Sequence, residues 1–98
     1  MSNYRRGQGA EYRAIKDLER VGYVCIRAAG SLGLFDVVAI SPVGVRLIQV
    51  KRVREGNISA GERELIREQM KAFKAPANVS KELWVWRDRQ GWIRQEVF

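Results

Sequence analysis

A carboxylate, an amide and an ammonium group fall on one predicted hairpin, where the two oxygen-bearing groups could bind a metal ion and the ammonium could offset negative charge. Asp36 belongs to the run Phe35–Ile40, and Gln49 and Lys51 belong to the run Val45–Arg52. Both runs are rich in β-branched residues, and a short turn segment with Pro and Gly separates them, which is typical of a β-hairpin. Because side chains alternate between the faces of a strand, a symmetric turn would place Asp36 directly opposite Gln49, with Lys51 further along the same face. A bulge or a three-residue loop would shift one strand by one residue and place its side chains on the opposite face of the sheet.

Charged side chains within strands also have simpler explanations. Asp and Lys are seldom buried unless they are paired or bind a metal. Asp36 and Lys51 could form an ion pair at the end of the sheet, or an inward charge could keep an edge strand from pairing further. The hairpin by itself leaves these alternatives open.

The composition favours a folded domain with a polyanionic partner. The 98 residues include 18 Lys and Arg against 11 Asp and Glu, a net charge of +7 that is spread along the chain. Such a balance favours nucleic acid as the partner. The sequence contains no histidine, which excludes a Ser-His triad and a histidine zinc site. Cys25 is the single cysteine, so no disulfide can form within the chain and we expect this residue to pack in the core.

The sequence shows neither a membrane span nor a secretory signal. No apolar run approaches the roughly 18 residues that a span requires, and no apolar segment follows the basic residues near the N-terminus. We therefore expect a cytoplasmic protein, in the nucleoid or in the host cytoplasm if it is phage-encoded. We expect no membrane partner and no small-molecule cofactor.

Hydrophobic periodicity predicts the order α-β-β-β-α-β-β. The expected elements are a helix Ala10–Val21, a strand Tyr23–Arg27, the two hairpin strands, a helix from a Ser59 cap to near Pro76, and strands Lys81–Arg87 and Trp92–Phe98. This order predicts a single α/β domain over residues 1–98, with a central mixed five-stranded sheet flanked by helices. Residues 1–9 are expected to form a flexible arm in which Arg5 and Arg6 could contact DNA.

Glu11 and a glycine-bearing loop are further candidates for a site. Glu11 begins the apolar stripe of the first predicted helix, so its carboxylate could approach the core. An acid in a first turn is also explained by the helix dipole alone. The loop Ala28–Leu34 contains two glycines, which permit close backbone approach to a ligand or serve only a tight connection.

Short motifs from across the chain carry a family resemblance. They are Gly9-Ala10-Glu11 at the start of a helix, Arg27-Ala28-Ala29-Gly30-Ser31 in a loop, Asp36-Val37-Val38-Ala39, Val50-Lys51 and Glu68-Gln69. In this order and spacing they resemble the PD-(D/E)XK nuclease superfamily, and within it the archaeal-type Holliday-junction resolvases. The resemblance spans roughly Arg5 to Trp86. It implies a restriction-endonuclease-like fold and a metal-dependent endonuclease that resolves four-way DNA junctions.

The resemblance also implies roles for individual residues. Glu11, Asp36 and Gln49 would be side-chain metal ligands, together with the carbonyl of Val50. Lys51 would lie beside the scissile phosphate, and Ser31 would lie on a loop that helps catalysis. Oxygen ligands of this kind suit Mg²⁺, or Mn²⁺ in its place, better than zinc. Gln49 departs from the family, which usually has Glu or Asp here, and the lost charge should weaken metal binding.

Resolvases act on branched DNA as two-fold dimers, and the resemblance implies both partners here. Candidate phosphate contacts are Arg5, Arg6, Arg13, Lys16, Arg27, Arg52 and Arg54. Candidate dimer contacts are Phe73, Trp84, Trp86 and Trp92, although aromatic residues that share a strand face are also typical of a core, and less often of a base-stacking platform. Two other functions remain open: a repair or restriction-type nuclease on flaps or linear duplex, and a non-catalytic basic DNA-binding module.

Overall fold

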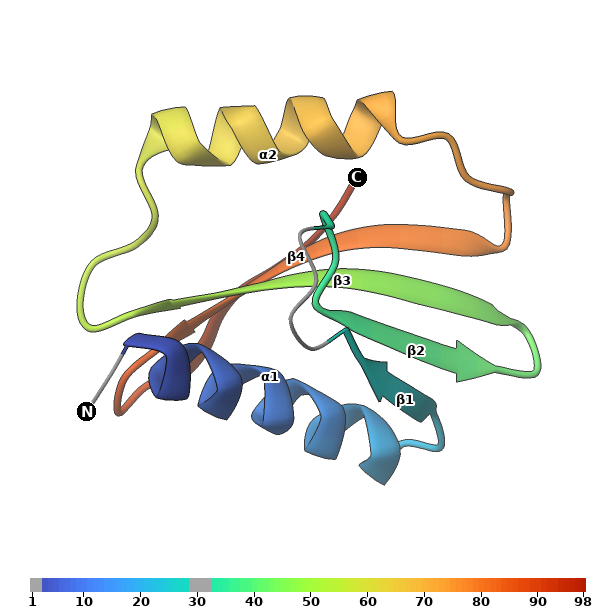
Figure 1. The fold of residues 1–98 in the computed structure, drawn as a ribbon, viewed down its shortest axis with the longest axis horizontal. Helices are drawn as coiled ribbons and strands as arrows, with labels where there is room; N and C mark the ends of the chain where they lie inside the picture. The colour runs from blue at the N-terminus through green and yellow to red at the C-terminus, as the bar shows by residue number, and fades with distance from the viewer. Residues whose placement is uncertain (1–2, 29–32) are drawn as a thin grey trace.

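The computed structural model describes residues 3–28 and 33–98, and within them a five-stranded sheet lies between two helices (Figure 1). The elements are α1 (Asn3–Arg20), β1 (Val24–Arg27), β2 (Val37–Ser41), β3 (Gly44–Val53), α2 (Ala60–Ala72), β4 (Val79–Arg87) and β5 (Gly91–Val97). The strands follow one another across the sheet in chain order. All neighbours are antiparallel except β3 and β4, which are parallel because α2 crosses over between them. The predicted α/β class, mixed sheet and element order are confirmed.

Each helix covers a different face of the sheet (Figure 1). On the α1 face, the buried apolar residues are Ala10, Ala14, Leu18, Val37, Ala39, Ile48, Val50 and Trp84. On the α2 face, they are Ile66, Met70, Leu83 and Val85. Strand β4 contributes to both clusters because its successive side chains point to opposite faces. This interior strand therefore packs against both helical layers.

Helix α1 is longer than its apolar spacing predicts. It begins at Asn3 instead of Ala10, so residues 3–9 are helical where a flexible arm was expected, and residues 1–2 lie outside the described part. The apolar stripe covers only the packed portion of the helix, whereas each added turn gains main-chain hydrogen bonds without needing an apolar side chain. The helix ends at Arg20, and Gly22 follows with a positive φ of 99° that few other residues adopt readily.

The hairpin has the predicted register, but its first strand starts later than expected. Val38 pairs with Leu47 and Ile40 with Val45, as a symmetric turn requires. Strand β2 begins at Val37 and not at Phe35, so Asp36 lies in a bend immediately before it. The boundaries of β4 and β5 also differ from those predicted by one or two residues.

Helix α2 has the predicted cap. The Ser59 side chain accepts a hydrogen bond from the Glu62 N–H at 3.0 Å, and the helix ends at Ala72, before the expected end near Pro76. No helix in residues 3–28 and 33–98 is long and apolar enough to cross a membrane.

A buried ion pair that the sequence did not reveal joins β3 to β4. Glu82 is only 2% exposed, and its carboxylate accepts two hydrogen bonds of 2.8 Å from Arg46. Ser80 and the Trp84 indole donate to the same carboxylate at 2.6 and 2.9 Å. Burial acts to raise the pKa of Glu82, but the hydrogen bonds from Arg46, Ser80 and Trp84 outweigh it and hold that pKa below its usual value. This ion pair therefore links β4 to β3, the strand that carries Gln49 and Lys51.

Candidate active site

Asp36 is held by main-chain hydrogen bonds from the strands on both sides. Its N–H donates to the Ile48 carbonyl at 2.8 Å, and its own carbonyl accepts from the Ala28 N–H at 2.8 Å. Its carboxylate accepts a hydrogen bond of 2.8 Å from the N–H of Val50. The sequence placed Asp36 within the strand and directly opposite Gln49. The ladder instead ends at the pair Val37–Ile48, because the carboxylate takes the Val50 N–H.

Glu11 comes from α1 and lies within electrostatic reach of Asp36. Its carboxylate accepts a hydrogen bond from Arg27 at 3.0 Å. Burial raises the pKa of Glu11, the hydrogen bond from Arg27 lowers it, and the negative charge of Asp36 raises it again, with a net increase. The helix and the start of β2 thus bring two acids together although they are distant in sequence.

Burial also raises the pKa of Asp36 above its usual value. The hydrogen bond from Val50 and the positive charge of Lys51 act in the opposite direction but do not cancel the effect of burial. Each of the two carboxylates therefore has surroundings that disfavour its negative charge. A cation placed between such groups would relieve that cost.

Gln49 presents a buried oxygen that is left without a partner. Among the described residues, none donates a hydrogen bond to its Oε1. The side chain lies on the α2 face beside Leu83 and lines a cavity of about 350 Å³ together with Gly33, Leu34 and Gln69. Buried polar atoms are nearly always satisfied, so an orphaned carbonyl oxygen in a cavity fits a site that receives a ligand.

Lys51 contacts an acid that the sequence reasoning did not place near it. Its ammonium lies 3.6 Å from the carboxylate of Glu62, in the first turn of α2, and both side chains are partly exposed. The charge of Lys51 nevertheless reaches Asp36, whose pKa it lowers. The only sequence signal for this contact was the helix cap, which puts Glu62 at the start of α2.

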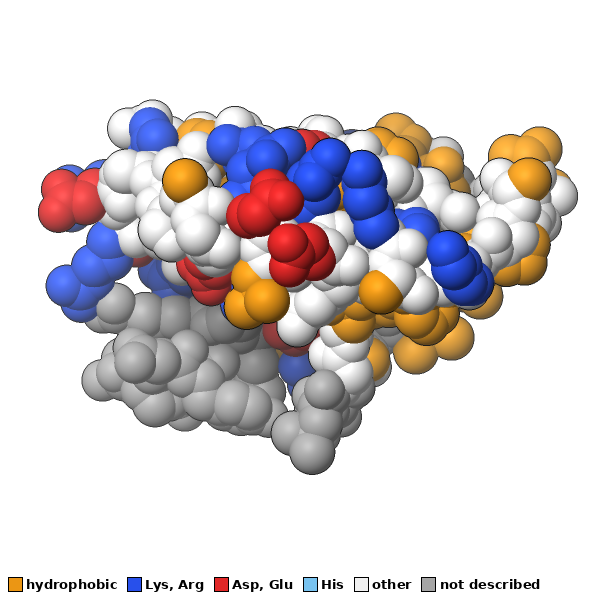
Figure 2. Space-filling view, turned by 90° about the horizontal axis from the view of Figure 1, so that it is seen from above, with side chains coloured by type: hydrophobic (Ala, Val, Ile, Leu, Met, Phe, Trp, Pro, Cys, Tyr) orange, Lys and Arg blue, Asp and Glu red, His pale blue; other side chains and the backbone are white. Residues whose placement is uncertain are grey.

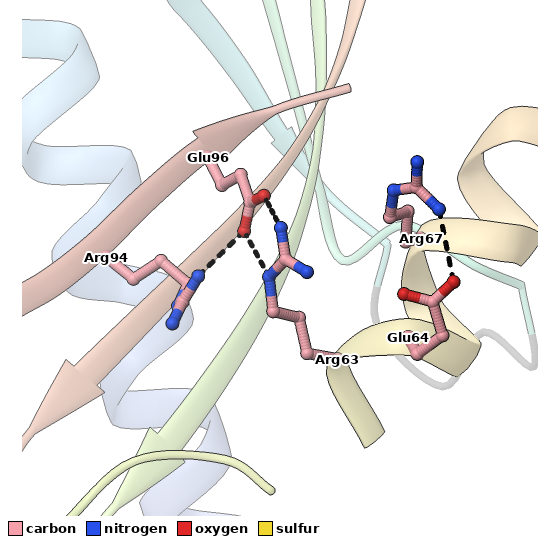
Figure 3. Close-up of polar contacts among 5 residues, drawn as sticks. All are labelled: Arg63, Glu64, Arg67, Arg94 and Glu96. Atoms are coloured by element: carbon pink, nitrogen blue, oxygen red, sulfur yellow. Dashed lines mark hydrogen bonds and ion pairs between the residues drawn. The ribbon is translucent and has the colours of Figure 1, made fainter. Parts of the chain in front are cut away.

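An ionic network holds this end of α2 against the sheet (Figure 3). Arg63 binds the carboxylate of Glu96 on β5 through two nitrogens, and Arg94 donates to the same carboxylate at 2.9 Å. Along the helix, Arg67 donates to Glu64 at 3.1 Å. Because Glu62 precedes Arg63, the network also positions the partner of Lys51.

The candidate ligands all donate through oxygen, which suits a cation that prefers oxygen. Together they carry less negative charge than three carboxylates would. Within the described ranges, no three Asp, Glu, His or Cys side chains form a group that could hold a metal. Glu11 and Asp36 supply two carboxylates, and Gln49 supplies a neutral oxygen. The Val50 carbonyl stays a predicted ligand, and Ser31 lies outside the described residues.

Two of the predicted DNA-binding arginines, Arg27 and Arg52, are paired with carboxylates of the chain. Arg27 pairs with Glu11 and lies over the Tyr12 ring, and Arg52 makes hydrogen bonds of 2.7 and 3.0 Å to Asp88. Arg54 is exposed beside Arg89, and Lys16 is exposed on α1. Arg13 lies over the ring of Trp86. The side chains of Arg5 and Arg6, in the first turns of α1, are outside the described part.

The fold is similar to that of a solved nuclease. Hjc from Archaeoglobus fulgidus, a Holliday junction resolvase from an archaeal hyperthermophile, is 25% identical with a TM-score of 0.64, over 89% of this chain and 69% of that one. Neither a protein-family model nor a curated protein sequence matches the chain. The chain therefore has the nuclease fold of a resolvase, and the similarity supports a resolvase-like nuclease. Membership of the PD-(D/E)XK superfamily stays a prediction.

The raised pKa of Asp36 predicts a stabilising substitution. A raised folded-state pKa means that protonation of Asp36 favours folding, and this contribution is lost as the pH rises through that pKa. At pH 7 the folded chain carries an unfavourably buried charge, so Asp36→Asn should unfold at higher urea than the wild type. The difference should vanish at about pH 3, below the ordinary aspartate value of about 3.9, where both side chains are neutral.

Urea unfolding in EDTA at both pH values measures this effect. Glu55→Gln, which removes an exposed acid, is the control and should leave the midpoint unchanged. An Asp36→Asn variant that is less stable than the wild type at pH 7 would contradict the electrostatic interpretation of the site.

Proposed function

We propose that the protein is a metal-dependent endonuclease that resolves four-way DNA junctions by paired hydrolysis of phosphodiester bonds. One observation supports this most strongly. In a resolvase-type fold, the carboxylates of Glu11 and Asp36 lie within electrostatic reach of each other, and Gln49 on β3 carries a buried oxygen that has no partner among the described residues. A non-catalytic DNA-binding module would have no use for two acids whose charge the fold disfavours.

The proposed cofactor is Mg²⁺, for which Mn²⁺ could substitute. Glu11, Asp36, Gln49 and the carbonyl of Val50 would hold the ion, and a bound cation of this kind activates water and neutralises charge on a phosphoryl group. The Val50 N–H fixes the orientation of the Asp36 carboxylate. Lys51, whose charge already reaches Asp36, would offset negative charge on the phosphate.

Substituting Asp36 separates cleavage from binding. Asp36→Asn keeps an oxygen that can accept the Val50 N–H but removes one ligand charge, so cleavage should fall by about a thousandfold or more while junction affinity changes less than about threefold. Labelled junction, flap and linear duplex, each incubated with Mg²⁺, Mn²⁺ or EDTA, provide the measurement.

The three substrates also distinguish the alternative functions. Symmetric metal-dependent nicks in the junction support the proposal, and preferential cutting of flap or duplex would instead make the protein a repair or restriction-type nuclease. Binding without cutting by the wild type, or continued cutting by Asp36→Asn, would contradict the proposed active site.

Restoring an acid at position 49 should strengthen metal binding. Gln49→Glu adds one negative charge to the proposed ligand set, and ligand charge count is a main determinant of affinity for hard cations. The concentration of Mg²⁺ that gives half-maximal cleavage should fall by about tenfold. The matched control is Gln69→Glu, which adds the same charge on α2 at another wall of the same cavity and should change this concentration much less. Equal effects of the two variants would mean that Gln49 is not a ligand.

We also propose that the protein acts as a homodimer through an apolar sheet face. Val24 and Ile26 face away from α1, because the residues between and before them pack against the α1 cluster, and Val24 pairs with Ile40. These side chains are 67%, 55% and 39% exposed. Figure 2 shows hydrophobic side chains gathered at the end of the molecule where β1 and the β2–β3 turn lie. A second copy, related by the two-fold symmetry that a junction offers, would cover this face.

The dimer contacts suggested by the sequence need correction. Trp84 is 3% exposed and packs within the chain, with Trp92 edge-on to it, so it is not available to a partner. Phe73 packs edge-on against Phe35 and stays 43% exposed.

A charge on this face tests the dimer. Ile26→Lys should convert a dimeric mass to a monomeric one in sedimentation or light scattering, because an unpaired ammonium would be buried in the interface. Val97→Lys, at a 62% exposed position on β5 at the opposite edge of the sheet from β1, is the control and should leave the mass unchanged. A monomeric wild type at working concentration would count against the proposal.

A further inference from the structure

A second pocket lies on the α1 face of the sheet, apart from the cavity that Gln49 lines. Its walls are Gly9, Ala10 and Arg13 from α1, Arg52 from β3 and Trp86 from β4, and its volume is about 380 Å³. It therefore combines two guanidinium groups, one indole ring and a stretch of helix that lacks bulky side chains. None of the roles assigned to the candidate active site uses Trp86.

The aromatic wall of the pocket is rigid. Trp86 packs edge-on against Trp92, with ring centroids 5.0 Å apart and planes at 80°. The Trp92 indole in turn donates a hydrogen bond of 2.8 Å to Asp17 on α1. Trp86 is partly buried by these contacts, so its ring has a fixed orientation before any ligand binds.

Arg13 supplies a positive charge that no carboxylate of the described residues neutralises. Its guanidinium lies 5.3 Å from the centroid of the Trp86 ring, a cation–π contact that orients it. Among the described residues no carboxylate pairs with Arg13, whereas Asp88 binds Arg52 through both of its oxygens. An oriented and unneutralised guanidinium next to an aromatic ring suits a phosphate together with its nucleoside.

The pocket also lies next to the candidate active site. Ala10 directly precedes Glu11 on α1, and Arg52 is two residues beyond Val50 on β3. Two residues of strand span about 7 Å, which corresponds to one or two nucleotides of a DNA strand. A strand with its scissile phosphate at Asp36 would therefore place a neighbouring nucleotide at this pocket.

We propose that this pocket binds a nucleotide of the DNA strand next to the scissile phosphate, with the phosphate at Arg13 and the nucleoside against Trp86. The inference rests on the proposed nuclease function and adds a second point of contact to it. Arg52 also lines the pocket, and Asp88 holds it in place. Such a contact fixes the register of the strand at the metal ligands without reading its sequence.

Equilibrium binding of a fluorescein-labelled four-way junction in EDTA tests the proposal without requiring cleavage. Arg13→Ala should raise the dissociation constant by about tenfold and reduce the steepness of its salt dependence by about one ion. Arg20→Ala is the matched control, since it removes the same charge from the other end of α1, where Arg20 is 72% exposed. This control should weaken binding less than about twofold.

A variant that leaves the charge unchanged distinguishes the contribution of the pocket to DNA binding from that of the overall positive charge. A Cβ added at Gly9 would meet nothing within 4 Å, so Gly9→Leu can place a side chain at the pocket without disturbing the fold. It should weaken binding about fivefold with an unchanged salt dependence. Equal effects of Arg13→Ala and Arg20→Ala, or wild-type affinity of Gly9→Leu, would overturn the proposal. A wild type that binds junctions without cutting them, while both pocket variants bind weakly, would instead reject the nuclease function and leave the pocket as a DNA site.

Discussion

The hydrogen bond from the main chain of Val50 to the carboxylate of Asp36 is the constraint on which the candidate site depends. It ends the β2–β3 ladder one residue early, at Val37, and replaces a main-chain acceptor with a side-chain oxygen. Asp36 is thereby fixed just before β2. From there its negative charge raises the pKa of Glu11, and the positive charge of Lys51 lowers the pKa of Asp36 itself. Without that bond, the acid could rotate toward solvent, where its negative charge would be better hydrated.

The surroundings of Asp36 disfavour its negative charge, although the hydrogen bond from Val50 holds the carboxylate in place. Burial raises the pKa values of both Glu11 and Asp36, and the oxygen of Gln49 is left without a donor in the described part of the chain. Features of this kind cost folding free energy, and they are common where a site is prepared for a ligand. Two ion pairs stabilise the same sheet elsewhere. Arg46 and Glu82 join β3 to β4, and Arg63 and Glu96 join α2 to β5.

The outline of the fold could be predicted because it follows from local patterns. The alternation in the hairpin, the Ser59 cap and the spacing of Ala14 and Leu18 each depend on residues close in sequence. The start of α1 could not be predicted in this way, since residues 3–9 carry no apolar stripe. The contact of Lys51 with Glu62 escaped prediction because it depends on how α2 docks on the sheet. That of Arg46 with Glu82 escaped it because it depends on the pairing of two strands that are distant in sequence.

By itself, the sequence determined the order of the elements and the register of the hairpin, and it nominated Glu11, Asp36, Gln49 and Lys51 as candidate site residues. These properties depend on side-chain type and on the two periodicities of strand and helix. Only the tertiary structure decided that Asp36 lies in a bend bonded to Val50, that Arg27 pairs with Glu11, and that Arg13 and Trp86 share a pocket. Those contacts bring together residues far apart along the chain, and packing of the helices on the sheet sets their distances.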